Sequence, residues 1–147
     1  MKSAEIRVYV HATEDEDKVV QSLEELIPED IEGEVEVEVE EYEGHYGNPI
    51  KVLRIKLEGE DARRLLDYIL SRVGEHDRRF IKASLDERVD RYGTLHLRFS
   101  KQDAYHGRVT LYESDDVIKV EIGFRGNRKK AMAEYERILE EKWDGSR

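Results

Sequence analysis

Eight consecutive residues, Glu43–Ile50, combine the side chains that are best suited to contact a ligand. The segment is EGHYGNPI, which places an imidazole (His45) and a phenol (Tyr46) between two glycines. Asn-Pro favours a turn, and glycine permits positive φ or close backbone approach. We therefore expect a connection between two strands, such as a long hairpin. A hinge needs only glycine, asparagine and proline, so the two added rings favour a contact loop.

Recognisable signatures of catalysis are absent from the sequence. There is no cysteine, which excludes thiol nucleophiles and cysteine-ligated zinc. No phosphate-binding loop, GxSxG or HExxH pattern occurs. The five histidines are dispersed, with no spacing typical of a metal site. We expect no catalytic residue, no metal site and no cofactor. The alternative is a small enzyme that uses His45, His96 or His106 with nearby carboxylates.

Charge is distributed unevenly along the chain, whose formal net charge is −10. Residues 1–50 carry 3 Lys/Arg against 16 Asp/Glu, a balance of −13. Residues 51–147 carry 22 against 19, a balance of +3. This asymmetry indicates either a solvated acidic face or a molecule with one acidic side and one basic binding side.

Length and composition favour one folded domain, residues 1–147, with a heavily charged surface. No apolar run approaches the length of a membrane helix, and the N-terminal sequence lacks the apolar block of a signal peptide. The absence of cysteine suits an intracellular protein. We expect a cytoplasmic protein that does not associate with membranes.

Hydrophobic periodicity predicts the element order β-α-β-β-α-α-β-β-β-α. Period-two alternation marks strands in residues 6–10, 33–41, 51–57, 94–99, 108–112 and 117–124. Helical spacing marks residues 16–27, 62–73, 77–89 and 128–139. A capping box of Thr13 and Glu16, a closing Gly74 and a capping Asn127 delimit three of the helices.

Each predicted strand and helix has one apolar face, so the elements should bury together as two layers. We therefore expect an α+β two-layer sandwich in which helices cover one face of a largely antiparallel sheet. The clearest strand pattern is GEVEVEVEE. It predicts that Val35, Val37 and Val39 are buried while Glu34, Glu36 and Glu38 are exposed. This acidic strand is also expected to dock a basic partner in a protein complex.

The other face of the sheet collects basic and aromatic side chains. By parity it carries Arg7, Tyr9, His11, Arg54, Lys56, Thr94, His96, Arg98, Arg108, Thr110, Tyr112, Lys119, Glu121 and Arg125. Guanidinium groups pair with phosphates, and flat rings stack on unpaired bases. The face therefore suits structured or single-stranded RNA. The alternative is a solvated face whose arginines pair with glutamates on neighbouring strands.

Two segments resemble a known family, and the similarity extends over nearly the whole chain. They are EGHYGNPI and DRYGTLHLRFSKQDAYHG. The archaeal family, described as predicted RNA-binding proteins or predicted exosome subunits, has a GH-[HY]-GNPI loop and a later D-x-x-GTL-x-LRF-x-KQ segment. The loop match comprises Gly44, His45, Tyr46, Gly47, Asn48, Pro49 and Ile50. The second match comprises Asp90, Gly93, Thr94, Leu95, Leu97, Arg98, Phe99, Lys101 and Gln102. Tyr92 and Ser100 stand where the family has acidic residues.

The resemblance implies RNA binding without chemistry, in ribosomal RNA or RNA-processing assemblies. It also implies a fold similar to that of the large-subunit ribosomal protein that binds 5S ribosomal RNA. Together with the second sheet face, it gives a set of expected RNA contacts. These are His45, Tyr46, Asn48, Arg54, Lys56, His96, Arg98, Lys101, Arg108, Arg125, Arg128 and Lys129.

Overall fold

The computed structural model describes residues 3–31, 35–44 and 47–144, which contain a five-stranded, fully antiparallel sheet of order β2-β3-β1-β5-β4. The strands are β1 (Ser3–Val10), β2 (Glu38–Glu43), β3 (Pro49–Glu58), β4 (Leu95–Phe99) and β5 (Ile118–Gly123). The helices are α1 (Glu16–Glu25), α2 (Gly59–Arg72), α3 (Glu75–Arg88), α4 (Lys101–Tyr105) and α5 (Arg128–Leu139), followed by the π-helical turn η1 (Glu140–Asp144).

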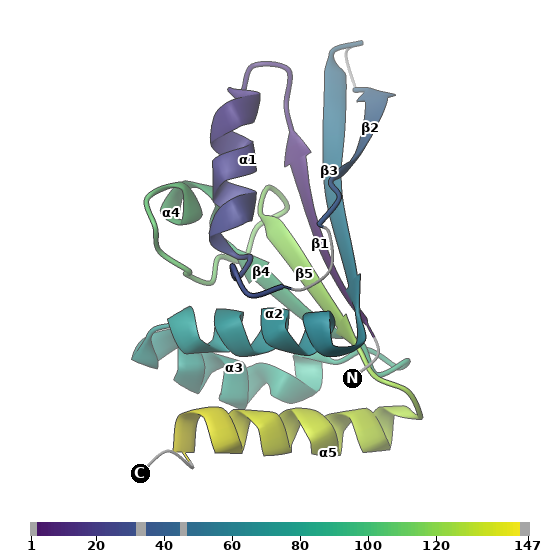
Figure 1. Cartoon of the computed structure of the whole chain (residues 1–147), viewed down its shortest axis with the longest axis vertical. Helices are drawn as coiled ribbons and strands as arrows, with labels where there is room; N and C mark the ends of the chain where they lie inside the picture. Colours follow the sequence, from purple (N-terminus) through teal and green to yellow (C-terminus); the bar gives the residue numbers. More distant parts are fainter. Residues whose placement is uncertain (1–2, 32–34, 45–46, 145–147) are drawn as a thin grey trace.

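The hydrophobic core lies between one face of the sheet and the helices. Burial alternates residue by residue along β1, β4 and β5, as the sequence pattern predicts. Helices α2, α3 and α5 lie across one end of the sheet and α1 lies beside the other (Figure 1). Their apolar stripes supply Val19, Leu66, Ile69, Ile81 and Tyr135, all buried. The predicted α+β sandwich with helices on one sheet face is confirmed.

Helix ends agree only in part with the sequence prediction. Asn127 caps α5, because its side-chain oxygen accepts a hydrogen bond from the Lys130 N–H at 2.9 Å. The cap of α1 is Asp15 rather than Thr13, and its carboxylate accepts from the Asp17 N–H at 3.0 Å. Gly74 does not close α2 with positive φ; it has a φ of −73° and begins α3.

The valines of the acidic strand are not buried as predicted. Val35 is half-buried, whereas Val37 is 43% and Val39 57% exposed. Val39 pairs with the buried Leu53, so it does point to the helix side of the sheet. However, β2 is the outer strand, and no helix lies over it (Figure 1). The alternation was correct, but burial also needs a covering layer. Glu34 lies outside the described residues.

The predicted strand at residues 108–112 is absent from the described structure, and the helix α4 precedes it. Ser100 caps α4 by accepting the Asp103 N–H at 3.0 Å. Residues 108–112 contribute only an isolated bridge between Phe99 and Leu111. The Leu111 N–H bonds to the carboxylate of Asp77 on α3, at 3.0 Å. The Asp77 side chain therefore accepts the Leu111 N–H that a strand would use for pairing. The order of elements differs from the prediction here, with α4 in place of a strand.

The opening segment EGHYGNPI connects β2 to β3 as a hairpin, as the sequence indicates. Gly47 has a φ of +77°, a conformation that disfavours other residues. A Cβ atom on Gly44 would lie 2.6 Å from the Asn48 carbonyl oxygen, so this position needs close backbone approach. Glycine is therefore required at Gly47 by its positive φ and at Gly44 by the close approach of the Asn48 backbone. His45 and Tyr46 lie outside the described residues.

Candidate nucleic-acid interface

Four basic residues form a line across the face of the sheet that the helices leave uncovered. Arg54 on β3 is opposite Arg7 on β1, Arg7 is opposite Lys119 on β5, and Lys119 is opposite Arg98 on β4. Neighbouring strands are only about 4.8 Å apart, so these cations repel one another unless anions lie near them. We call Arg54, Arg7, Lys119 and Arg98 the basic row.

Carboxylates neutralise one half of the basic row. Arg54 donates to Glu40 at 2.7 Å and lies 3.5 Å from Glu5. Arg7 lies 3.6 Å from Glu5 and donates to Glu121 at 3.1 Å. These cross-strand pairs are the alternative arrangement that the sequence left open. For Arg54 and Arg7 that arrangement is the observed one.

The other half of the basic row has no such neutralisation. Within the described residues, neither Lys119 nor Arg98 has a carboxylate oxygen within 4.0 Å. Arg98 makes one long hydrogen bond of 3.4 Å to the Ser114 carbonyl oxygen. The Lys119 ammonium lies 5.8 Å from the centre of the Tyr9 ring. A depression of about 230 Å³ is lined by Arg7, Lys119 and Arg98, and also by Glu121, whose carboxylate is paired with Arg7. It leaves room for an anionic group beside two cations.

His96 lines the same depression, and a carboxylate lies near each of its two ring nitrogens. Its Nε2 is 2.8 Å from Asp90, and its Nδ1 is 3.8 Å from Glu121. Burial raises the pKa of Asp90, but hydrogen bonds from His96 and from the backbone N–H groups of Thr94 and Tyr92 lower it further, so the net shift is downward. This arrangement fixes the imidazole next to the basic row.

The other predicted contact on this face is Lys56. Its side chain is exposed, and its Nζ lies 4.0 Å from the Oε2 of Glu38. The structure therefore brings four of the expected contacts onto one face: Arg54, Lys56, His96 and Arg98. Arg7 and Lys119 complete the row, although sequence reasoning did not include them among the contacts. Their even spacing with Tyr9 and Glu121 assigned them to this face. Only the strand order shows that they lie between Arg54 and Arg98.

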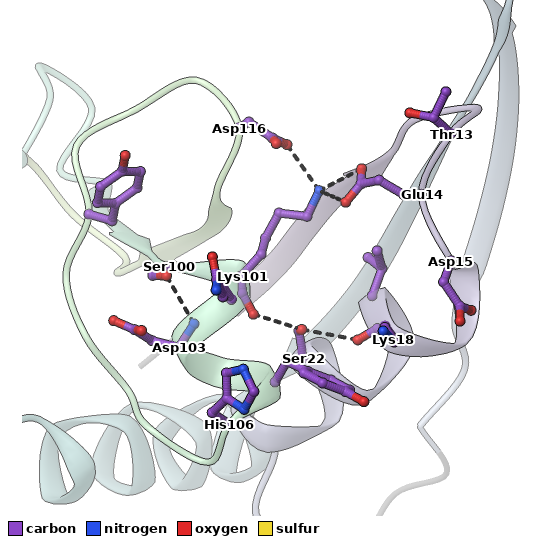
Figure 2. Close-up of a pocket in the computed structure, with 14 residues that line it drawn as sticks. Thr13, Glu14, Asp15, Lys18, Ser22, Ser100, Lys101, Asp103, His106 and Asp116 are labelled. Carbon is purple, nitrogen blue, oxygen red and sulfur yellow. Dashed lines mark hydrogen bonds and ion pairs between the residues drawn. The ribbon is translucent and has the colours of Figure 1, made fainter.

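Lys101 occupies a structural position instead of an exposed one. Its side chain is 10% exposed, and its Nζ lies 2.9 Å from the Tyr9 carbonyl oxygen, 2.9 Å from Glu14 and 3.0 Å from Asp116 (Figure 2). Three acceptors use the three N–H groups of an ammonium. Lys101 therefore joins the end of β1, the start of α1 and the segment before β5, and it has no donor left for a phosphate.

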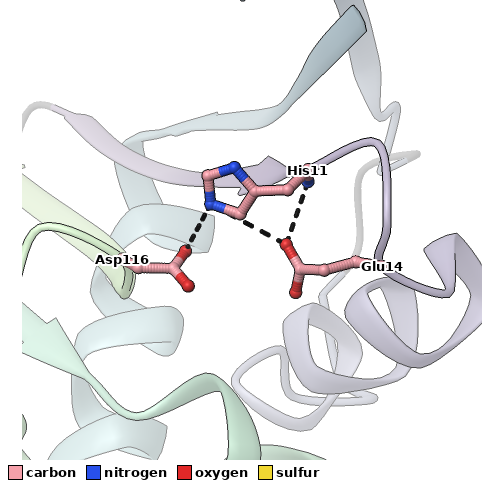
Figure 3. Close-up of side chains that lie close together, drawn as sticks. All are labelled: His11, Glu14 and Asp116. Atoms are coloured by element: carbon pink, nitrogen blue, oxygen red, sulfur yellow. Dashed lines mark hydrogen bonds and ion pairs between the residues drawn. The ribbon is translucent and has the colours of Figure 1, made fainter. Parts of the chain in front are cut away.

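His11, Glu14 and Asp116 approach one another closely enough to suggest a metal site. Their ligand atoms lie within 4.8 Å of one another, and the His11 Nε2 is 3.1 Å from Asp116 (Figure 3). The ammonium group of Lys101 already binds both carboxylates of this cluster. A cation of the protein therefore balances these acids, which explains the cluster without a metal ion.

The remaining expected contacts lie away from the basic row. Arg108 pairs with Asp103 at 3.3 Å. Arg128 donates to Asp86 and to the carbonyl oxygens of Asp86 and Val89, and so fastens α5 to α3. Arg125 and Lys129 are exposed near the start of α5, and Asn48 is exposed in the β2–β3 hairpin. None of these residues occupies one of the four paired strand positions of the basic row.

The described helices include none that is long and apolar enough to cross a membrane.

Comparison with known proteins gives a consistent result. A family model described as RNA binding matches residues 3–124. An RNA-binding protein of Pyrococcus abyssi is 42% identical over 119 residues, which cover 80% of this chain and 77% of that protein. An uncharacterised protein of Methanocaldococcus jannaschii is 34% identical over 128 residues, 85% of each chain.

Solved structures show the same fold. A protein from Archaeglobus fulgidus is 32% identical with a TM-score of 0.77, covering 94% of this chain and 98% of that one. A protein from Sulfolobus solfataricus is 29% identical with a TM-score of 0.78, covering 93% and 96%. Both are described as DUF54 proteins. From the match over residues 3–124 and the 42% identity to its relative, this chain belongs to the RNA-binding family.

Proposed function

We propose that this protein binds RNA without catalysing a reaction, and that the basic row contacts the phosphates. The observation that supports this most is the unequal neutralisation of the row. Lys119 and Arg98 lie side by side on an uncovered face, and no carboxylate in the described structure is within 4.0 Å of either. A bound phosphate would relieve the repulsion between these cations and would be held by charge-assisted hydrogen bonds.

The rings beside the row favour single-stranded or structured RNA over duplex DNA. Tyr9 and His96 flank Lys119 and Arg98 on the same face. Unpaired bases can stack on such rings, whereas the bases of a duplex are not accessible for stacking. The net charge of −10 opposes a polyanion, so we expect weak binding that falls steeply with salt.

Other expected contacts would extend this interface. We propose that Lys56 and the hairpin residues His45, Tyr46 and Asn48 contact the RNA on either side of Arg54, toward the two ends of β3. Lys56 follows Arg54 on β3, and the hairpin joins β3 to β2. Arg108, Arg125 and Lys129 are exposed and would add weaker electrostatic contacts. Arg128 is held by α3, and so its main contribution is to stability.

A substitution that removes only charge tests the proposal. Replacing Arg98 and Lys119 by glutamine should weaken binding of a single-stranded RNA oligonucleotide at least tenfold at low salt. If each residue contacts one phosphate, the slope of log K against log salt should become shallower by about 1.4 to 1.8. Fluorescence anisotropy across a salt series measures both quantities.

The matched control replaces Arg79 and Arg137 by glutamine. Both are exposed helical arginines paired with glutamates, so the net charge changes equally. Binding should change less than twofold. Equal losses in the two double variants would show that only net charge matters, and would refute the basic row as the binding site.

The noncatalytic part of the proposal rests on the surroundings of the histidines. His96 contacts two carboxylates, Asp90 and Glu121, and no hydroxyl group. In the described structure, no carboxylate oxygen lies within 4.0 Å of the His106 ring nitrogens. The His96 cluster has the histidine and nearby carboxylates of the enzyme alternative, but no hydroxyl nucleophile contacts this imidazole in the described structure, which favours the noncatalytic proposal. The family description likewise names RNA binding.

A second proposed role is docking of a protein partner on β2, within a ribosomal RNA or RNA-processing assembly. The observation that favours it is an uncovered outer strand with exposed Val37 and Val39 between glutamates. A basic strand with alternating apolar residues would pair its backbone with β2 and its charges with the glutamates. Substituting Val37 and Val39 by serine should abolish co-purification of such a partner while RNA binding persists. Retention of the partner would refute this surface.

A further inference from the structure

A second cavity is lined by Lys101 and is separate from the depression at the basic row. It is a wide-open cavity of about 910 Å³ between the start of α1, the helix α4 and the segment before β5 (Figure 2). It shares no residue with the depression beside Lys119 and Arg98. We propose that this cavity binds an unpaired nucleobase of the RNA. This proposal rests on the RNA binding proposed above and adds a base-recognition site to it.

The walls of the cavity are held in place by internal bonds. The buried Ser22 hydroxyl lies 2.8 Å from the Lys101 carbonyl oxygen and 3.0 Å from that of Lys18, which ties α1 to α4. The Lys101 ammonium ties Glu14 to Asp116 across the floor (Figure 2). The cavity is therefore present before a ligand arrives, which reduces the entropic cost of binding.

The carboxylates that line the cavity are already engaged. Glu14 and Asp116 bind Lys101, Asp15 caps α1, and Asp103 accepts from Arg108 at 3.3 Å. They nevertheless keep four negative charges around one space. A phosphate would be repelled there, because the described lining residues include four acids and only two cationic side chains, Lys18 and Lys101. The ligand group that enters the cavity should be uncharged.

The neutral side chains of the cavity have unused hydrogen-bonding groups. In the described structure, the side chains of Gln102, Tyr105, His106 and Tyr112 make no hydrogen bond to protein. The Tyr105 and His106 rings are in edge contact, with centres 5.2 Å apart. The Lys18 ammonium lies 5.5 Å from the Tyr105 ring centre. Rings that can stack and a free amide that can pair are the groups that recognise an exposed base, with glutamine suited to adenine.

The cavity and the basic row are connected through Tyr9. Lys101 in the cavity wall donates to the Tyr9 carbonyl oxygen at 2.9 Å, and the Tyr9 ring lies 5.8 Å from the Lys119 ammonium in the row. One RNA strand can therefore place phosphates along the row and turn a base into the cavity. Phosphate contacts would supply affinity, and the cavity would supply preference for a base.

The test compares two probes with the same backbone. One is a 12-nucleotide oligoadenylate, and the other is a ribose-phosphate oligomer of equal length without bases. The native protein should bind the oligoadenylate about tenfold more tightly, since one stacked base contributes that much or more. The variant Gln102→Ala/Tyr112→Ala should lose most of this preference, and any remainder should come from bases stacked on Tyr9 and His96 beside the basic row. Tyr112 is 56% exposed and Gln102 is exposed, so the fold should be unaffected.

The control is Tyr92→Ala, another exposed tyrosine, located before the start of β4 while the cavity follows its end. It should keep the preference for bases. The proposal fails if the native protein binds both probes equally, or if the cavity variant keeps the preference. Tight binding of free adenosine without any oligomer preference would assign the cavity to a nucleoside instead. If neither probe binds, the proposed RNA binding fails as well, which the native protein alone would reveal.

Discussion

Single residues in this protein have roles that their type alone does not reveal. Lys101 is the clearest case, because its match to the family segment implied an RNA contact. In the structure its ammonium is enclosed by Tyr9, Glu14 and Asp116. Lys101 therefore links β1 to the segments that precede α1 and β5, and the sequence pattern alone could not reveal these contacts. The partners are up to 92 residues away in the chain.

Replacing Lys101 by methionine should therefore lower the free energy of unfolding by about 2 kcal/mol at pH 7, because two acids lose their common cation. This cost is below the roughly 3–5 kcal/mol for breaking a fully buried ion pair, because Glu14 and Asp116 are partly exposed. Lys51→Met removes an exposed pair with Glu16 and should destabilise the protein clearly less. Urea denaturation of both variants measures the difference. Similar costs would contradict the fastening role.

The cost of the Lys101 substitution should also depend on pH. Burial raises the pKa of Asp116, but the hydrogen bond and charge of Lys101, with those of His11, lower it further, so its net pKa is depressed. A depressed carboxyl pKa stabilises the fold above the ordinary value of about 3.9, and this contribution is lost as pH falls through the folded-state pKa. The difference between native and variant stability should shrink below about pH 4. A constant difference would exclude Asp116 as the coupled group.

The strand β2 shows that alternation predicts the direction of side chains but not their burial. Alternation correctly predicted which way Val39 points, because side chains in a strand change face at every residue. It could not predict that β2 would be the outer strand, because strand order depends on pairing between distant segments. The missing strand at 108–112 has a similar cause: Asp77 on α3 takes the Leu111 N–H.

This difference in burial predicts opposite results for two paired residues. Val39→Ala should change the free energy of unfolding by less than about 0.5 kcal/mol, since its side chain is largely exposed. Leu53→Ala, directly opposite on β3, should cost about 2–5 kcal/mol because it leaves a cavity in the core. Thermal or urea unfolding distinguishes the two. A large cost for Val39→Ala would mean that another layer covers β2.

The hairpin itself gives a prediction about backbone conformation. Gly47 has a φ of +77°, and no atom outside its own neighbours lies closer than 3.6 Å to an added Cβ. Gly47→Val should therefore destabilise the protein by about 1–3 kcal/mol through backbone strain alone. Gly47→Asn, which tolerates this region better, should cost clearly less. Equal costs for the two variants would show that crowding, not conformation, requires the glycine.

For the whole molecule, the uneven charge along the sequence becomes a spatial arrangement. Acids from the first third, Glu5 and Glu40, neutralise the Arg54 and Arg7 end of the basic row. The end formed by β4 and β5 lies farthest from β2 and keeps two uncompensated cations. The interpretation that arginines pair with glutamates therefore applies to the Arg54 and Arg7 half, and RNA contact is proposed for the other half. Sequence parity identified the face, but only the strand order shows where the neutralised half ends.

Binding of RNA to the uncovered sheet face can be tested by amide chemical-shift mapping. A ¹⁵N-labelled sample would be titrated with a 12-nucleotide single-stranded RNA at low salt. The largest chemical-shift changes should occur at Arg7, His96, Arg98 and Lys119, and they should diminish as salt is added. Shifts concentrated on the outer surfaces of α2 and α3, with the basic row unchanged, would contradict it.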